Sequence, residues 1–387
     1  MLQAALIAAS LTAGHAVQNA DVAYTGPIRR DEPKIYRMTF AATVSTPMER
    51  RAENRLNFNL QDTPIVFPLI EQGAYSEIDA SSLAGHLWLG NVEDTTLPQR
   101  SRIDRGAPMG TQLAIMPIAQ FQGQSLRWEI AFDVQCWASE ADDAALGQIA
   151  WPREWPAEVS DALKPQMYIE SDDEIFKATV ERVSEGKLRM VPPYYAAKDL
   201  IRYCLNEIRV SGDGINKGYN GELQGLEMIG AKQTATSGTG GPHDLVCVCV
   251  AMLRAAGIPA RPVIGISEGG RKGRRGRAEF LSWGEFYLPG AGWIPFDPDA
   301  MRGKGLRNAD VKRPWSQLGT IRDLNERIPL AYHFIPPVSV SVPRNPAVWG
   351  WDMRPVKLQY VDQFINLGIV SKGAGAIRVP QAPGGTR

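Results

Sequence analysis

This chain of 387 residues lacks several features that would assign it to a simple functional class. It carries no net charge, because 42 Lys and Arg residues balance 42 Asp and Glu residues, and this argues against nucleic acid as the main partner. Its four cysteines and four histidines form no CxxC motif and no Cys–His metal spacing, so we expect no metal and no other cofactor. No apolar run is long enough to cross a bilayer, so we expect no transmembrane segment.

The cysteines themselves are expected to be small buried apolar side chains. Cys136, Cys204, Cys247 and Cys249 are scattered, and the last two lie two residues apart on an expected helix, where they point in different directions. The number and placement of these cysteines do not require an oxidising compartment. The chain also has no Walker pattern and no GxGxxG in a strand-turn-helix setting, which excludes a nucleotide site.

The N-terminal residues 1–16 imitate a short secretory signal, with an apolar stretch and small residues near Ala16. No Lys or Arg precedes the apolar stretch, so half of the signature is missing. We therefore favour a soluble, cytoplasmic or assembly-associated protein over an exported one. Residues 1–34 are read as an N-terminal tail or linker.

Alternating apolar and polar residues predict an antiparallel β domain over residues 35–165, including an acidic connector from about residue 138. The clearest run has Leu126, Trp128, Ile130, Phe132, Val134 and Cys136 on one face and Arg127, Glu129, Asp133 and Gln135 on the other. Such alternation indicates strands with one buried and one wet face.

Helical signals follow. Ser171 and Glu174 form a predicted capping box, with Ser171 as the cap, and Gly186 ends the helix. A second helix is expected after Pro192 and Pro193. Residues 211–241 contain nine glycines and are read as a long loop.

The next helix, from Pro242, is apolar on nearly every side and therefore belongs at the centre of the fold. Pro242 suits the first helical position, Asp244 suits the positive end of the helix dipole, and Gly257 supplies the left-handed cap. An extended segment, residues 262–266, follows it.

The stretch from residue 240 to 298 resembles the bacterial transglutaminase-like family, which has a papain-like α+β core. The resemblance rests on Arg-Ala-Ala-Gly-Ile-Pro-Ala-Arg at 254–261, Trp-x-Glu-x-Tyr at 283–287 and Pro-Gly-x-Gly-Trp-x-Pro-Phe-Asp-Pro at 289–298. It extends more weakly over about 165–345. The resemblance implies an α+β fold class: an N-terminal antiparallel β domain followed by a transglutaminase-like (papain-like) α+β core.

The same resemblance places a Cys-His-Asp triad, and two of its members are replaced. The family's cysteine stands twelve residues before the first arginine of the 254–261 motif, a position held here by Pro242. Its histidine stands two residues before Trp283, a position held by Leu281. Only the aspartate position keeps its residue, as Asp297.

Other residues are weak candidates for the missing chemistry. Cys247 and Cys249 lie about 7.5 Å and about 10.5 Å further along the helix axis, too deep to reach its start. His243 and Asp244 remain weak catalytic candidates, with a hydroxyl of Ser237 or Thr239 activated by His243 as one alternative. Without thiolate and imidazole, we predict a catalytically inactive domain.

Each residue that matches the family motifs can be interpreted as structural or as functional. Asp297 is at least as readily a turn residue as a relic, and Arg254 and Arg261 are expected to bind carbonyls or carboxylates within the fold. Trp283, Glu285 and Trp293 are candidate binding residues, although core and rim packing explains the aromatics at least as well. A cationic loop is either a solvated tip or a docking site for an acidic surface; its members are Arg271, Lys272, Arg274, Arg275 and Arg277.

Together these patterns predict domains at 35–165 and 166–345, flanked by the tail and by a C-terminal extension, 346–387, whose end we expect to be disordered. The favoured function is a protein-binding or structural assembly module with a protein or peptide partner, as one component of a larger assembly. Two alternatives stay open: an active peptide-acyl transferase or protease with a non-standard catalytic set, and an unrelated binding role of the β domain, such as glycan or envelope binding.

Overall fold

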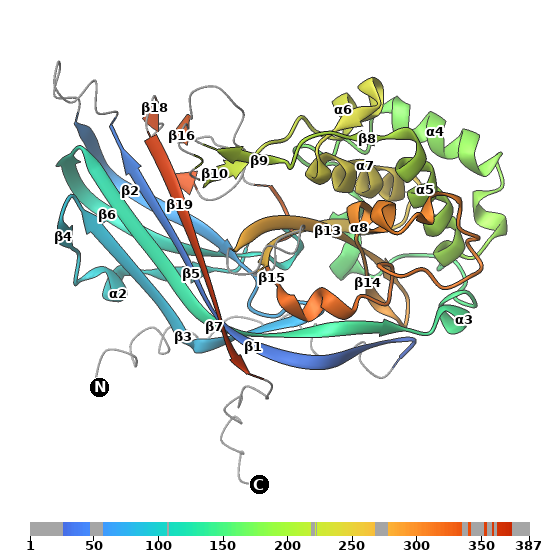
Figure 1. The fold of residues 1–387 in the computed structure, drawn as a ribbon, viewed down its shortest axis with the longest axis horizontal. Helices are drawn as coiled ribbons and strands as arrows, with labels where there is room; N and C mark the ends of the chain where they lie inside the picture. Colours follow the sequence, from blue (N-terminus) through green and yellow to red (C-terminus); the bar gives the residue numbers. More distant parts are fainter. Residues whose placement is uncertain are drawn as a thin grey trace, which may run out of the picture.

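A computed structural model describes residues 26–46, 57–106, 108–217, 221, 223–267, 278–334, 340–341, 352–353, 358–359 and 362–373. Two β-sheets lie at one end of the molecule, and helices gather around a smaller sheet at the other (Figure 1). The α+β fold class predicted from the sequence is confirmed. No helix among the described residues is long and apolar enough to cross a membrane.

The first sheet has seven strands in the order β4-β3-β7-β1-β19-β10-β9. They are β1 (Ile28–Ser45), β3 (Ser76–Leu89), β4 (Val92–Glu93), β7 (Ser125–Ala141), β9 (Ile215–Lys217), β10 (Leu223–Leu226) and β19 (Asp362–Gly373). The second sheet has the order β17-β2-β6-β5, with β2 (Phe58–Leu69), β5 (Arg102–Asp104), β6 (Gln112–Gly123) and β17 (Asp352–Met353). The short helix α2 (Leu97–Arg100) lies between β4 of the first sheet and β5 of the second, and η2 (Pro108–Gly110) lies between β5 and β6.

The alternation in β7 produces the buried face that the sequence predicts. Its six apolar residues from Leu126 to Cys136 are at most 2% exposed. The rings of Phe40, Trp128 and Phe67 meet between the two sheets, with Phe40 4.8 Å from Phe67 and 5.3 Å from Trp128. This aromatic cluster joins the sheets face to face. Gln135, expected on the wet face, is buried because this end of β7 also contacts the η6 turn (Arg322–Glu326).

Segments far apart in the chain complete the large sheet. β1 begins at Ile28, inside the stretch read as a linker, and β19 comes from the predicted C-terminal extension. β19 pairs antiparallel with β1 along its whole length, and β10 pairs with β19. The sheet therefore links the N-terminal strands to the C-terminal segment and to the glycine-rich stretch. We call the two sheets together the β module.

The other end of the molecule is built on a sheet of the order β14-β13-β12-β15. Its strands are β12 (Ala260–Ser267), β13 (Glu279–Leu288), β14 (Gly292–Phe296) and β15 (Arg327–Ala331), and we call it the core sheet. The longer helices around it are α4 (Glu174–Ser184), α5 (Pro193–Glu207), α6 (Ala231–Ser237), α7 (Pro242–Ala255) and α8 (Pro298–Gly303). The short α-helix α3 (Asp143–Leu146) and the 3₁₀ segments η3 (Ala157–Leu163), η4 (Leu188–Met190) and η5 (Leu306–Asn308) lie between these elements.

Helix α7 is the centre of this half, as its composition predicts. Every residue from Pro242 to Arg254 is buried, and the helix contacts α4, α5, α6, α8 and the core sheet. Gly257 has φ +75°, the left-handed conformation predicted for the residue that ends the helix. Strand β12 follows, as expected.

Two local predictions need correction. Helix α4 begins at Glu174, and its cap is Asp173, whose carboxylate accepts from the Ile175 amide at 3.1 Å; Ser171 is not the cap. Residues 211–241 are not one structureless loop, because β9, β10, α6 and β11 (Thr239–Gly240) form within them. Strand β11 pairs with β8 (Arg209–Val210), so ladder bonds organise the stretch despite its glycines.

Several predicted features fall outside the described residues: the signal-like segment 1–16, the cationic loop around 271–277 and the tail beyond residue 373. Further along the chain, β16 (Val340–Ser341) pairs with β18 (Leu358–Gln359).

Candidate functional site

The start of α7 is held in place by one carboxylate. Asp244 Oδ2 accepts from the Gly241 amide at 2.8 Å, which caps the helix. Asp244 Oδ1 accepts from the amides of Ile229 and Gly230 at 2.9 and 3.0 Å. Burial raises the pKa of Asp244, although the three amides act against that shift. Asp244 is therefore a structural clamp between the helix start and the preceding segment.

The imidazole of His243 joins α7 to strand β13. Its Nδ1 lies 2.8 Å from Ser282 Oγ, and both side chains are 0% exposed. Gly214 packs closely against His243 and Pro242. A Cβ added at Gly214 would lie 2.5 Å from His243 Cδ2 and 3.2 Å from Pro242 Cδ. Gly214 has φ +71°, so both its conformation and its neighbours require glycine. Pro242 and His243 thus lie beneath the backbone at Gly214.

Strand alternation decides which residues of β13 face the helix. Ser282 contacts α7 through His243, and β13 pairs with β12 without a bulge. Leu281, Trp283 and Glu285 therefore lie on the opposite face of the core sheet, which we call its far face. Leu281 is buried there and pairs with Gly265 of β12. The side chain of Leu281 therefore lies on the face of the sheet that points away from the start of α7.

Asp297, at the end of β14, has two partners. Its Oδ1 accepts from the Ala300 amide at 3.0 Å and caps α8, and its Oδ2 accepts from Arg327 Nη1 at 2.7 Å. Arg327 also donates to Asp323 at 2.8 Å and to Gln317 at 3.4 Å. Burial lowers the pKa of Arg327, but Asp297 and Asp323 outweigh it, so the guanidinium stays charged.

The arginines of the 254–261 motif bind within the fold, as predicted. Arg254 donates to the carbonyls of Ala260 and Lys164 at 2.7 and 2.6 Å. Arg261 pairs with Glu285 at 2.7 Å and lies between the rings of Trp293 and Tyr332, 3.8 and 3.5 Å from their centroids. Burial raises the pKa of Glu285, and Arg261 opposes the shift.

The candidate binding residues differ in accessibility. Trp283 and Glu285 are buried on the far face, whereas Trp293 is partly exposed. Side chains that are buried in this way contribute to packing and ion pairing rather than to an open surface. The cationic residues Arg271, Lys272, Arg274, Arg275 and Arg277 lie outside the described residues.

The four cysteines are buried and free, as predicted. Burial raises the pKa of Cys247 and Cys249 well above the ordinary value, which disfavours the nucleophilic thiolate. Within the described residues no hydrogen bond joins a cysteine to a histidine. Ser237, considered as a nucleophile beside His243, instead donates to the carbonyl of Thr239 at 2.9 Å.

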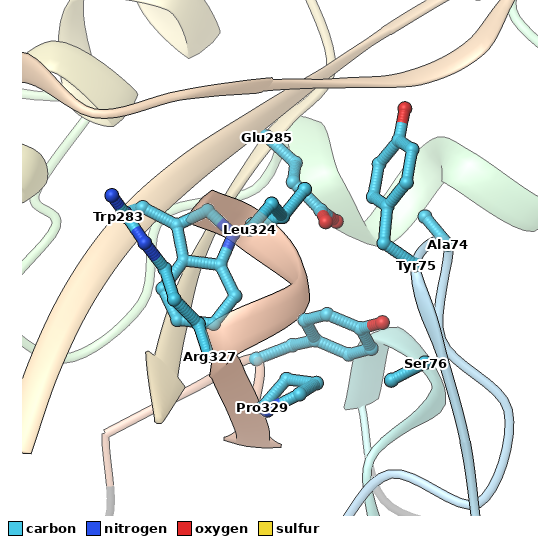
Figure 2. Close-up of a pocket in the computed structure, with 9 residues that line it drawn as sticks. Ala74, Tyr75, Ser76, Trp283, Glu285, Leu324, Arg327 and Pro329 are labelled. Carbon is cyan, nitrogen blue, oxygen red and sulfur yellow. The ribbon is translucent and has the colours of Figure 1, made fainter. Parts of the chain in front are cut away.

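Two hollows lie near these elements. An open groove of about 400 Å³ runs over α6; Glu170, Ile229, Lys232, Gln233, Thr236 and Ser237 line it. A small cavity of about 10 Å³ lies between the far face of the core sheet and the β module (Figure 2). The part of the chain that is described shows no group of three or more side chains able to hold a metal ion.

Sequence reasoning missed Ser282 and Arg327 as residues of this region. Ser282 lies 39 positions from His243, and Arg327 lies 30 positions from Asp297. No periodic pattern in the sequence predicts either contact, because both contacts depend on how β13 and β15 pair with β12. Only the glycine at 214 gives a local hint that another chain segment approaches closely.

Comparisons with known proteins agree with this architecture. Residues 178–298 match the model of the transglutaminase-like superfamily. The fold resembles a candidate cysteine protease from Cytophaga hutchinsonii, with a TM-score of 0.54 and 12% identity over 90% of this chain and 94% of that one. The periplasmic domain of TgpA from Pseudomonas aeruginosa is a weaker match, with a TM-score of 0.32 and 12% identity over 71% and 92% of the two chains. No curated protein matches the sequence.

Proposed function

From the premise that residues 178–298 form a transglutaminase-like domain, we propose that this protein keeps the fold without thiol catalysis and serves as a polypeptide-binding module. Pro242 and Leu281 stand at the cysteine and histidine positions that the resemblance implies. The observation that carries the proposal is the set of contacts around the third position: Asp297 is bound to Arg327 and caps α8. Among the described residues no hydrogen bond joins this carboxylate to an imidazole, which a Cys-His-Asp triad would require.

The closed start of α7 supports the same proposal. A catalytic thiolate at a helix N-terminus needs an open approach for its substrate. Here Gly214 covers Pro242, and the neighbouring imidazole is engaged with Ser282. The cysteines elsewhere on α7 are buried and have raised pKa values. These contacts support a domain that lacks a reactive thiol and open access to the start of α7.

Substitutions at two pairs of positions test this geometry. The change Pro242→Cys with Leu281→His restores the residue types but places histidine on the far face, so we expect no amide hydrolysis and an unperturbed thiol pKa. The matched pair His243→Cys with Ser282→His uses positions whose side chains already meet at 2.8 Å. That pair should show a lowered thiol pKa in an ultraviolet absorbance titration of the thiolate, which does not require a reagent to reach the buried site. Hydrolysis by the first pair at a rate typical of an enzyme would contradict the proposal.

Exposed apolar side chains near η4 support the proposal that the protein binds a polypeptide. Met190 is 78% exposed, and Val191 beside it is also exposed. The carbonyl of Val191 accepts from Trp151 Nε1 at 2.8 Å, which holds the indole ring against this segment. Partly exposed Trp155 continues the surface, with its ring 6.5 Å from that of Trp151. We propose this surface as a contact for an extended apolar segment of a polypeptide partner.

The binding proposal is tested by photocrosslinking from position 191, the exposed neighbour of Met190, in extracts of the source cell. Met190→Glu should abolish the crosslinked and co-purifying polypeptide. Val92→Glu serves as the matched control, because Val92 is 71% exposed on β4 of the β module, in the other half of the molecule. Equal loss with both variants, or no loss with either, would count against this surface.

A second function is favoured by one contact, the 2.8 Å hydrogen bond between Ser282 and His243. In a serine acyl transferase or protease, Ser282 Oγ would attack the acyl carbon while His243 Nδ1 takes its proton and then passes it to the leaving amine. A fluorophosphonate probe tests this directly. Covalent labelling that disappears in Ser282→Ala would favour this function, whereas the absence of labelling supports the inactive module.

A further inference from the structure

Four partly exposed aromatic side chains contact one another in sequence along the transglutaminase-like domain, and we call them the aromatic row. The ring centroid of Trp155 lies 6.5 Å from that of Trp151 and 6.5 Å from that of Tyr287. The Tyr287 centroid in turn lies 5.5 Å from that of Trp293. Successive ring planes meet at 73°, 73° and 69°, so each ring meets the next edge to face. The row begins at the surface beside Met190 and extends it to β13 and β14.

The two tryptophans at the start of the row are fixed by the backbone. Trp151 Nε1 donates to the Val191 carbonyl at 2.8 Å, and Trp155 Nε1 donates to the Gly257 carbonyl at 2.9 Å. Both indole N–H groups are thus already used, and the rings offer a ligand mainly apolar surface. Because the rings are held before binding, a ligand that lies against them pays little for ordering them.

Such a surface favours a polypeptide segment with few backbone N–H groups. An amide that is laid against an apolar ring loses its water without gaining a good acceptor. Proline has no N–H, and a proline-rich segment in the polyproline II conformation is already extended before it binds. Aromatic surfaces recognise such segments in several domain families. A glycan is favoured less, because its hydroxyls need polar partners and the indole donors of Trp151 and Trp155 are engaged.

Opposite charges lie at the two ends of this surface. The exposed guanidinium of Arg189 lies 3.9 Å above the first ring of the row. Exposed Glu158 is close to Tyr287: burial raises the pKa of the phenol, and the charge of Glu158 raises it further. The exposed residues Arg153 and Glu154, which are neighbours in the chain, carry opposite charges. A complementary segment therefore has an acidic residue at one end and a basic residue at the other.

We propose that the aromatic row binds a proline-rich segment of the partner in the polyproline II conformation, with an acidic residue at Arg189 and a basic residue at Glu158. The inference rests on the proposed function, because it specifies the chemistry of the polypeptide that the binding module contacts. A run of about six prolines spans about 19 Å, which is long enough to pass Trp151, Trp155 and Tyr287.

Fluorescence anisotropy of a labelled peptide tests the ligand class with the whole protein. The probe has about six prolines between an aspartate and a lysine, and the control peptide replaces the prolines with Gly-Ser repeats. The proline peptide should bind more tightly, and Trp155→Ala should weaken its binding about tenfold or more. Trp88→Ala is the matched control, because Trp88 is also partly exposed beneath a guanidinium, that of Arg127 at 4.6 Å, but belongs to the β module. Equal binding of the two peptides, or equal losses in the two variants, would overturn the inference.

A charge reversal tests the ends of the segment independently of peptide direction. The unmodified protein should bind the mixed peptide more tightly than a proline peptide with lysine at both ends. Arg189→Glu should reverse this order, and added salt should reduce the difference. Arg127→Glu in the β module should leave the order unchanged. The same order in Arg189→Glu as in the unmodified protein would contradict the proposed charge pairing. If Trp155→Ala does not fold, this exposed substitution still decides.

The inference and the proposed function fail in different experiments. Crosslinking from position 191 that depends on Met190, combined with equal binding of the proline and Gly-Ser peptides, would overturn only the polyproline inference. Binding of a cello-oligosaccharide that is lost in Trp155→Ala would assign the row to a glycan. A dimer that dissociates in the same variant would assign it to a second copy of this chain. Either result would overturn the inference.

Discussion

Arg327 Nη1 lies 2.7 Å from Asp297 Oδ2, and both side chains are almost fully buried, at 6% and 7% exposed. The pair connects the end of β14 to the start of β15 across the core sheet. Asp297 also caps α8, and Arg327 also binds Asp323 and Gln317, so the four side chains form one closed network. The carboxylate that the family resemblance associates with catalysis is therefore part of the structural framework.

The first prediction concerns the stability that depends on this pair. Arg327→Met would leave the Asp297 carboxylate buried without its cation, so we expect a loss of about 3–5 kcal/mol in the free energy of unfolding. Urea denaturation at neutral pH measures it. Lys34→Met is the control, since the Lys34–Glu326 pair is exposed and its loss should be hard to detect. A small loss for both variants would show that the buried pair is dispensable.

The second prediction concerns acid. Burial acts to raise the pKa of Asp323, but Arg327 and Gln317 outweigh it, so the pKa lies below the ordinary 3.8. A carboxylate with a lowered pKa in the folded state adds stability above its unfolded pKa, and this is lost as the pH falls below 3.8 and through the folded pKa. Asp323→Asn should therefore lower stability at neutral pH and flatten the acid limb of the stability profile. An unchanged acid limb would argue against a charged Asp323 contact.

The third prediction concerns the clamp at the start of α7. Asp244→Asn keeps the side-chain shape but replaces one acceptor oxygen with a donor that faces backbone amides. We expect a loss of about 1–3 kcal/mol in the free energy of unfolding and faster hydrogen exchange at Gly241, Ile229 and Gly230. Asp161→Asn, in an exposed pair with Lys164, should change neither quantity. Unchanged exchange at the three amides in Asp244→Asn would refute the clamp.

The fourth prediction concerns packing beside that clamp. In Gly240→Ala, the new Cβ would lie 2.7 Å from the Thr234 side chain and 2.8 Å from Asp244 Cβ. We expect a loss of about 1–3 kcal/mol from overpacking. Gly303→Ala provides the contrast, because nothing lies within 4 Å of its Cβ and the residue ends helix α8. That change should stabilise the protein by about 0.5–1 kcal/mol. Thermal denaturation of both variants measures the two effects. A Gly240→Ala variant at least as stable as the Gly303→Ala variant would contradict the prediction.

The sequence was most informative where structure follows from local patterns. The period of two in β7 and the all-round apolar composition of α7 predicted a buried strand face and a central helix, and both are present. The 254–298 motifs predicted the transglutaminase-like domain, which the family match at 178–298 confirms. These features depend on neighbouring residues, so a single sequence is enough to reveal them.

The contacts of the candidate site were less predictable. That Asp297 pairs with Arg327 depends on strand register across the core sheet, and no local pattern encodes it. The closure of the large sheet by β19 likewise depends on a segment more than 300 residues from β1. The cap of α4 shows a finer limit, because Ser171 and Asp173 are both good capping residues and only the backbone path selects Asp173.

The most direct test of the central claim is mass spectrometry of the folded protein after treatment with a thiol-reactive electrophile at neutral pH. All four cysteines are buried, and burial raises the pKa of Cys136, Cys247 and Cys249. We predict that no cysteine is modified in the time that labels all four in the denatured protein, and that peptides do not change this result. Rapid modification of one cysteine, with protection by a peptide, would contradict the account.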